Sequence, residues 1–206
     1  MEPVFNLPFA EWTVINELEK HFSKTEGYTV LIPSSRQQKG FDIILYNNFS
    51  KKSLTIQVKG SRTYTPKPPK RKTIIRYKNY TWFNSFNAAK GLSDYYILLG
   101  LYIKVPNKES VTTNINNQNW FDFVLLLFTE DEMMTFLNSL TLKKSEKADS
   151  KFGFGFDDSE KIHLTRGAKD KIDYTDKLFK KRLLELKGKL NPDKKKYVSK
   201  KRLSAA

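Results

Sequence analysis

Two apolar segments that read as neighbouring β-strands, residues 41–46 and 54–59, constrain the fold of this chain more than any other feature. Both are rich in the branched and aromatic residues that strands favour, and turn-forming residues lie between them. The pair therefore predicts a β-hairpin. Asp42, Gln57 and Lys59 interrupt these runs with polar or charged side chains. Polar groups set into apolar strands need a partner or a function, so these three residues are the first candidates for a site.

The segments before the hairpin complete an αβββ order. Residues 8–23 place Ile15, Leu18 and Phe22 at helical spacing, which predicts an amphipathic helix. Residues 28–32 are a short run of strand-favouring residues that ends before a proline. The chain is thus expected to open with one helix followed by three strands.

The remainder of the chain predicts further strands and helices. Apolar runs at 95–105 and 120–128 predict two buried strands, and Thr129 with Glu132 predicts a capped helix that reaches about residue 140. Shorter elements are expected as strands at 73–77, 152–156 and 161–164 and as helices at 85–90 and 177–190, the last capped by Asp176. The order predicts an α/β fold with a mixed central sheet flanked by helices.

The charge of the chain is strongly positive and unevenly distributed. The formal net charge is +15, and residues 177–202 alone hold 12 Lys or Arg against 2 acidic residues. This distribution favours a polyanionic partner, nucleic acid before anionic lipid. The alternative is a solvated tail that aids solubility. We expect one domain over residues 1–190 and a basic tail at 191–206.

A basic, proline-containing connection at residues 60–80 adds candidate contacts to nucleic acid. Aromatic residues lie among its cations, which suits contact with phosphates and bases, although a solvated lysine loop would have the same composition. The expected nucleic-acid-binding residues here and in the C-terminal helix are Arg62, Lys67, Lys70, Arg71, Lys72, Arg76, Lys78, Lys180, Lys181 and Arg182.

Composition also limits the chemistry. The chain has no cysteine and two histidines, which excludes thiolate zinc sites, disulfides and cysteine nucleophiles and disfavours a multi-histidine metal site. Any metal should be a hard cation bound by oxygen, such as Mg²⁺ or Mn²⁺. No apolar run approaches the roughly 20 residues of a membrane span, and the N-terminus does not read as a signal peptide. We therefore expect a cytoplasmic protein without a membrane partner.

The three interrupting residues fit the needs of phosphodiester hydrolysis. Gln57 and Lys59 are two residues apart, so they face the same side of a strand. The Asp42 carboxylate, the Gln57 amide oxygen and the Val58 carbonyl oxygen could coordinate a divalent cation. Lys59 would lie beside it, where it can act on water or stabilise the charge of the transition state.

With this hairpin, the chain resembles the PD-(D/E)XK nuclease superfamily, which has a restriction-endonuclease-like αβββαβ core. The resemblance covers about residues 8–61 and rests on Asp42 and on the segment Ile56-Gln-Val-Lys-Gly-Ser, a variant with glutamine in place of the usual acid. Phe41 stands where the family has proline. The resemblance implies a Mg²⁺-dependent endonuclease, with DNA favoured over RNA as the substrate.

The family often adds a glutamate from the first helix to its metal site. At 100° per residue, Glu11 projects from the apolar stripe of residues 8–23, whereas Glu17 and Glu19 lie away from it. Glu11 is therefore the expected additional ligand, with Glu17 as the second choice.

Two other functions remain open at this point. The first is a catalytically inactive protein that keeps the nuclease fold and binds nucleic acid, because Gln57 removes one acidic ligand. The second is a structural protein of a ribonucleoprotein particle, which the basic tail would permit but which leaves Asp42 and Gln57 unexplained. The sequence also leaves open RNA as the substrate, the target, the pathway and a homodimeric state.

Overall fold

The computed structural model describes residues 9–35, 40–61, 77, 79–103, 121–142, 145–156, 161–168 and 172–191. Its helices are α1 (Phe9–His21), α2 (Glu130–Asn138) and α3 (Phe179–Leu190), with short 3₁₀ turns η1 (Lys24–Glu26) and η4 (Thr175–Lys177). Its strands are β1 (Tyr28–Leu31), β2 (Ile43–Asn47), β3 (Lys52–Gly60), β4 (Asn79–Asn84), β5 (Tyr95–Ile103), β6 (Phe121–Thr129), β7 (Lys151–Phe156) and β8 (Ile162–Arg166).

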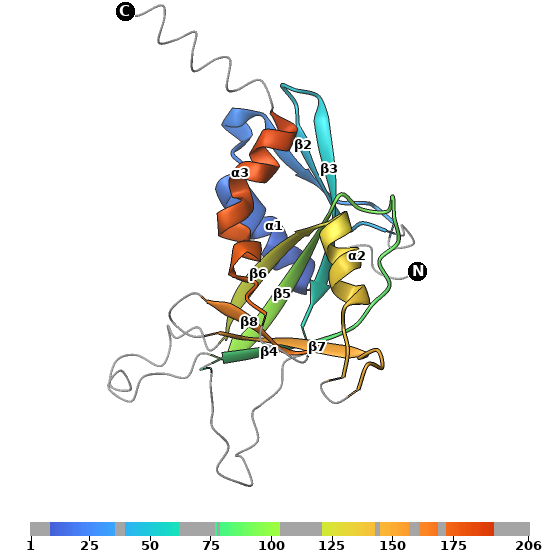
Figure 1. Cartoon of the computed structure of the whole chain (residues 1–206). Coiled ribbons are helices and arrows are strands. Elements are labelled where there is room, and N and C mark those ends of the chain that lie inside the picture. Colours follow the sequence, from blue (N-terminus) through green and yellow to red (C-terminus); the bar gives the residue numbers. More distant parts are fainter. Residues whose placement is uncertain are drawn as a thin grey trace, which may run out of the picture.

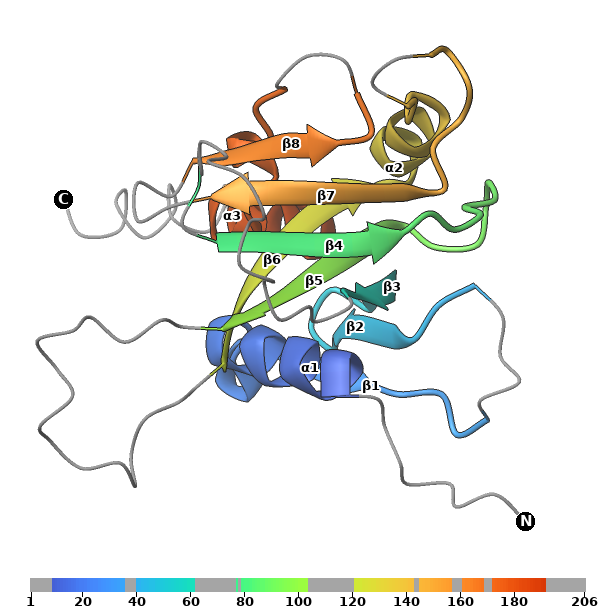
Figure 2. The ribbon, with the colours of Figure 1, turned by 90° about the horizontal axis from the view of Figure 1, so that it is seen from below.

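These elements form two sheets that are layered on each other. The larger sheet has the order β1-β2-β3-β5-β6, with β3 and β5 parallel and the other neighbours antiparallel. The smaller sheet is antiparallel with the order β4-β7-β8. Helices α1 and α3 lie together on one side of the larger sheet (Figure 1). The smaller sheet and α2 cover its other face, opposite α1 (Figure 2).

The first hydrophobic core lies between the larger sheet and helices α1 and α3. The helical stripe predicted from Ile15, Leu18 and Phe22 is buried there, together with the alternate strand residues Ile43 and Ile56. Helix α3 adds three buried side chains from its own stripe, Phe179, Leu186 and Leu190. Burial of this amphipathic surface explains why these segments are helical and where they dock.

The second core is largely aromatic and uses the alternating Phe and Gly residues of β7. Phe152 and Phe154 are fully buried, as expected for a strand that contributes phenylalanines to a core. The intervening glycines leave room for other rings: a Cβ on Gly153 would lie 2.7 Å from Trp82, and one on Gly155 would lie 2.5 Å from Tyr77. Glycine is thus needed on the face where neighbouring aromatic residues cover β7.

Several sequence predictions are confirmed and others are wrong. The α1–β1–β2–β3 opening is present, and Thr129 and Glu132 form the predicted capping box at the start of α2. Residues 85–90 form no helix, and the N–H of Ser85 instead donates to the Ser150 carbonyl (2.8 Å), which ties this segment to the smaller sheet. Asp176 does not cap α3, because it lies in η4 and the helix begins at Phe179 without a side-chain cap.

The expected αβββαβ order is confirmed only as a mixed α/β architecture. In the described residues between β3 and β5, the chain forms β4 of the smaller sheet, and the next helix, α2, follows β6. Of the predicted strand 73–77, only residue 77 is described, and all of the tail but residue 191 lies outside the described residues. None of the helices in the described parts combines the length and apolar character needed to cross a membrane.

Candidate active site

Asp42 occupies the point where the β2–β3 ladder ends. The register runs to Ile43 opposite Ile56, and the Asp42 N–H donates to the Ile56 carbonyl (2.9 Å). At the next position of β3, the hydrogen bond is made to a side chain instead of to the backbone: the Asp42 Oδ2 accepts the Val58 N–H at 2.7 Å. The carboxylate is therefore held against β3, next to the backbone of the residue between Gln57 and Lys59.

The environment of Asp42 shifts its acidity. Burial raises the pKa of Asp42 above its usual value, and the Val58 N–H and the positive charge of Lys59 only partly offset this effect. A half-buried carboxylate with a raised pKa beside a lysine is typical of functional sites. A cation near this carboxylate would compensate for its lost hydration.

Gln57 and Lys59 lie on the face of the larger sheet that is opposite to α1. Their parallel partners in β5 are Tyr96 and Leu98, which belong to the second core, whereas Val58 packs in the first core. Within the described residues, the half-buried Gln57 side chain forms no hydrogen bond. Its amide is thus available to a ligand, as the sequence prediction requires.

Lys59 has an aromatic neighbour that the sequence did not indicate. Its Nζ lies 5.1 Å from the centre of the Phe86 ring, a distance that allows a cation–π interaction. Phe86 in turn stacks on Tyr96 of β5, with ring centres 6.2 Å apart. No signal in the sequence pointed to Phe86, because it lies in the segment where a helix was expected.

Thr55, a further polar residue of β3, has a structural partner. Asp94 precedes β5, and its Oδ2 accepts both the Thr55 N–H (2.7 Å) and the Thr55 hydroxyl (2.8 Å). This pair joins the start of β5 to β3. It therefore accounts for Thr55 and Asp94 without a catalytic role.

The two candidate glutamates of α1 lie in different surroundings. A Cβ on Gly60 would lie 3.1 Å from the Ala10 Cβ, so the first turn of α1, which contains Glu11, lies beside the end of β3. Helix α1 packs on the face of the larger sheet opposite to Gln57, so a ligand from Glu11 would have to reach the site around the end of β3. Glu17 is buried, forms an ion pair with Lys20 and lines a separate cavity. Of the two, only Glu11 lies at the end of the sheet where Lys59 is found.

The donor set suits a hard cation bound mainly by oxygen. The described residues contain no group of three or more His, Cys, Asp or Glu side chains that could hold a metal ion. The residues that could hold one are Asp42 through its carboxylate, Gln57 through its amide oxygen and Val58 through its carbonyl. The Val58 N–H points to the Asp42 side of β3, and its carbonyl points to the same edge. These are the kinds of oxygen that Mg²⁺ and Mn²⁺ accept.

The expected nucleic-acid-binding cations are only partly described. All seven in the connection lie outside the described residues: Arg62, Lys67, Lys70, Arg71, Lys72, Arg76 and Lys78. Lys180 and Lys181 are exposed in the first turn of α3. Arg182 is largely buried, and its guanidinium donates to Glu185 (2.8 Å), to Glu132 and to the Leu127 carbonyl (2.8 Å). These bonds give Arg182 a structural role, so we do not retain it as a contact to nucleic acid.

Comparison of the sequence with models of protein families and with curated proteins finds no match for this chain. The functional argument therefore rests on the site itself.

Proposed function

We propose that this protein is a metal-dependent nuclease that hydrolyses phosphodiester bonds in DNA and uses Mg²⁺ or Mn²⁺. The observation that carries the proposal is the placement of Asp42 where β2 leaves β3, beside Gln57 and Lys59. Burial raises the pKa of the Asp42 carboxyl, and the Lys59 charge acts on it. The resemblance to the PD-(D/E)XK superfamily and the net charge of +15 support the same function.

The residues would divide the work as follows. Asp42, Gln57 and the Val58 carbonyl would hold the cation, and Glu11 is the further ligand that the resemblance implies. A bound divalent cation supplies neutralisation of phosphoryl charge and a lowered pKa for a bound water. Lys59 would place its ammonium near the same phosphate and stabilise the charge that develops in the transition state.

A cleavage assay tests this proposal directly. Purified protein is incubated with supercoiled, linear, single-stranded and branched DNA in Mg²⁺, Mn²⁺ or EDTA. We expect metal-dependent cleavage that falls by about a thousandfold in Asp42→Asn and in Lys59→Ala. Lys52→Ala is the matched control, since Lys52 is an exposed lysine at the other end of β3. Near wild-type cleavage by either site variant would refute the assignment.

One observation favours a second candidate, a protein that keeps this site but binds DNA without cutting it. Gln57 supplies a neutral oxygen where the resembled family has a carboxylate, so the cation would be held less tightly. Gln57→Glu distinguishes the two functions. If the native protein cuts DNA, the glutamine site is sufficient. If only Gln57→Glu cuts, the native protein is the non-cutting form.

A further inference from the structure

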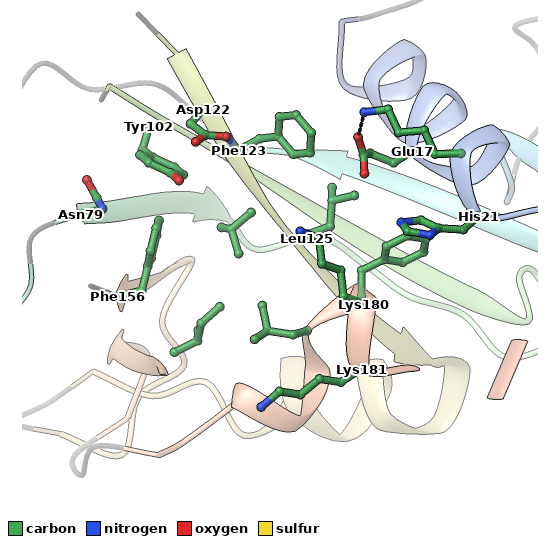
Figure 3. A pocket seen from close by; sticks show the side chains of 15 residues that line it. Glu17, His21, Asn79, Tyr102, Asp122, Phe123, Leu125, Phe156, Lys180 and Lys181 are labelled. Carbon is green, nitrogen blue, oxygen red and sulfur yellow. Dashed lines mark hydrogen bonds and ion pairs between the residues drawn. The ribbon is translucent and has the colours of Figure 1, made fainter. Parts of the chain in front are cut away.

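A cavity of about 610 Å³ opens at the β6 edge of the larger sheet, apart from the candidate active site. It lies between α1, the start of α3 and the smaller sheet (Figure 3). Lys59 pairs with Leu98 of β5, which pairs with Leu126 of β6, so β6 is two strands away from Lys59. Asp122, which lines the cavity, lies four residues from Leu126 along β6. With about 4.8 Å between strands and about 3.3 Å per residue, the separation is on the order of 15 Å. The cavity is therefore a second place where a ligand could bind.

One side of the cavity offers aromatic surface. Tyr102 and Phe156 both line it, with ring centres 4.9 Å apart in an edge-to-face arrangement. Phe123 and Leu125 of β6 extend the apolar surface. Such a wall suits a flat aromatic ring, because stacking on protein rings requires an apolar face and little else.

Polar groups stand beside this wall. Asn79 and Asp122 line the cavity on the same side as Tyr102 and Phe156 (Figure 3). An amide presents both a hydrogen-bond donor and an acceptor, and a carboxylate accepts from amino and imino groups, although one Asp122 oxygen already accepts the Phe123 N–H (2.8 Å). Together these groups match the edge of a nucleobase better than that of a hydrocarbon ring.

The positive charge lies on the other side. Lys180 and Lys181 reach the cavity from the first turn of α3, and neither forms an ion pair within the described residues. The charge of Lys20, by contrast, is paired with Glu17. The two α3 lysines therefore provide unneutralised charge on the side opposite the aromatic wall, with the Lys180 side chain directed toward β6 and the Lys181 side chain extending in another direction (Figure 3).

We propose that this cavity binds one nucleotide unit, with its base against Tyr102 and Phe156 and its phosphate near Lys180 and Lys181. Its volume lies within the roughly 300–1,000 Å³ range of small-molecule sites. Two sources supply this chemistry: a free mononucleotide, or a nucleotide whose base has left the stack of a DNA strand. Only the second source rests on the proposed function.

Binding measurements in EDTA test the proposal without any cleavage. The full chain is titrated by calorimetry with each of the four deoxynucleoside 5′-monophosphates and with inorganic phosphate. Affinity is then compared for a matched DNA duplex and for the same duplex with one unpaired base. The variants are Lys180→Ala/Lys181→Ala, Tyr102→Leu and Asn79→Ala. The double variant Lys24→Ala/Lys189→Ala removes the same charge from exposed positions that do not line the cavity.

The outcomes separate the sources. In the first outcome, a monophosphate binds at least tenfold more tightly than phosphate, and this advantage is lost in the cavity variants but not in the control. This result would identify a free nucleotide as the ligand. In the second outcome, the monophosphates bind no better than phosphate, but the duplex with an unpaired base binds on the order of tenfold more tightly than the matched duplex. If Tyr102→Leu or Asn79→Ala abolishes this preference, the ligand is a nucleotide of a DNA strand.

The absence of both preferences overturns the proposal. A thermal melt checks that each variant is folded, and Asn79→Ala gives an independent result if Tyr102→Leu is not. The same titrations on Asp42→Asn keep this test separate from that of the nuclease, because Asp42 does not line the cavity. Loss of cleavage with intact nucleotide binding would then affect only the proposed active site.

Discussion

Asp42 carries a charge that its surroundings disfavour. Because burial raises the pKa of Asp42, the folded protein holds its proton more tightly than the unfolded chain does. The contribution of Asp42 to stability therefore falls as pH rises from its pKa in the unfolded chain, 3.8, through its raised pKa in the folded protein. A residue kept at such a cost is expected to serve a function rather than the fold.

This cost leads to a prediction for Asp42→Asn. The amide oxygen can still accept the Val58 N–H, whereas the desolvated charge is lost. We expect the variant to be at least as stable as the wild type at pH 7 and to lose cleavage. Its advantage in stability should shrink on acidification and vanish below about pH 4, where aspartate is protonated in both states. Urea unfolding between pH 3 and 8 measures this, and a variant that is less stable at pH 7 would contradict it.

Phe86 is expected to position Lys59. Its ring lies under the ammonium, so Phe86→Leu removes the cation–π contact but retains apolar volume against Tyr96. We expect kcat to fall several-fold with little change in DNA affinity, since such contacts contribute about 0.5–1 kcal/mol at partly exposed sites. Phe86→Tyr should restore the rate. An equal loss in both variants would mean that Phe86 acts only through packing.

At the scale of elements, a cluster of ion pairs joins α3 to α2. Burial alone would raise the pKa of Glu132, but bonds from Arg182 and Lys177 outweigh it and lower this pKa to about 2. The stabilisation is therefore complete above about pH 4.5 and is lost as pH falls from there towards 2.

Glu132→Gln should weaken this connection. We expect Tm at pH 7 to fall by roughly 2–4 °C, which corresponds to about 1 kcal/mol in a chain of this size. Asp131→Asn is the control, because Asp131 is an exposed acid in the same helical turn. The difference between the two variants should disappear near pH 2. A difference that persists unchanged at pH 2 would contradict the electrostatic origin.

Elements that depend on interactions between residues close in the sequence could be predicted. Elements that depend on contacts between residues distant in the sequence could not. The stripe of α1 and the hairpin with Asp42, Gln57 and Lys59 follow from spacing alone. The capping box of α2 does so as well. The segment 85–90 could not be predicted, because its conformation depends on a bond to Ser150 and on the position of Tyr96. The cavity likewise requires α1, α3 and both sheets, which no local pattern relates.

At the scale of the whole molecule, the excess of positive charge should govern contact with DNA. Deleting residues 192–206 removes six cations and one acid. We expect weaker DNA binding with a flatter dependence of log K on log salt, since fewer counterions are released. Unchanged cleavage at saturating DNA is the accompanying expectation. An equal salt slope in both forms would leave the connection at 60–80 and α3 as the main binding surface.

The position of β5 between the two cores has a consequence for how the backbone opens. Ile97 and Leu99 are buried on one side of this strand, and Tyr96 and Leu98 are buried on the other. The strand is also hydrogen-bonded to β3 along one edge and to β6 along the other. The amide hydrogens of these residues should therefore exchange with deuterium only when the whole molecule unfolds. The β2–β3 ladder ends at Asp42, where the last backbone bond is that of the Asp42 N–H to Ile56, so exchange there should be faster than in β5. The proposed chemistry would thus lie at the end of a ladder, two strands away from the backbone that is expected to exchange most slowly.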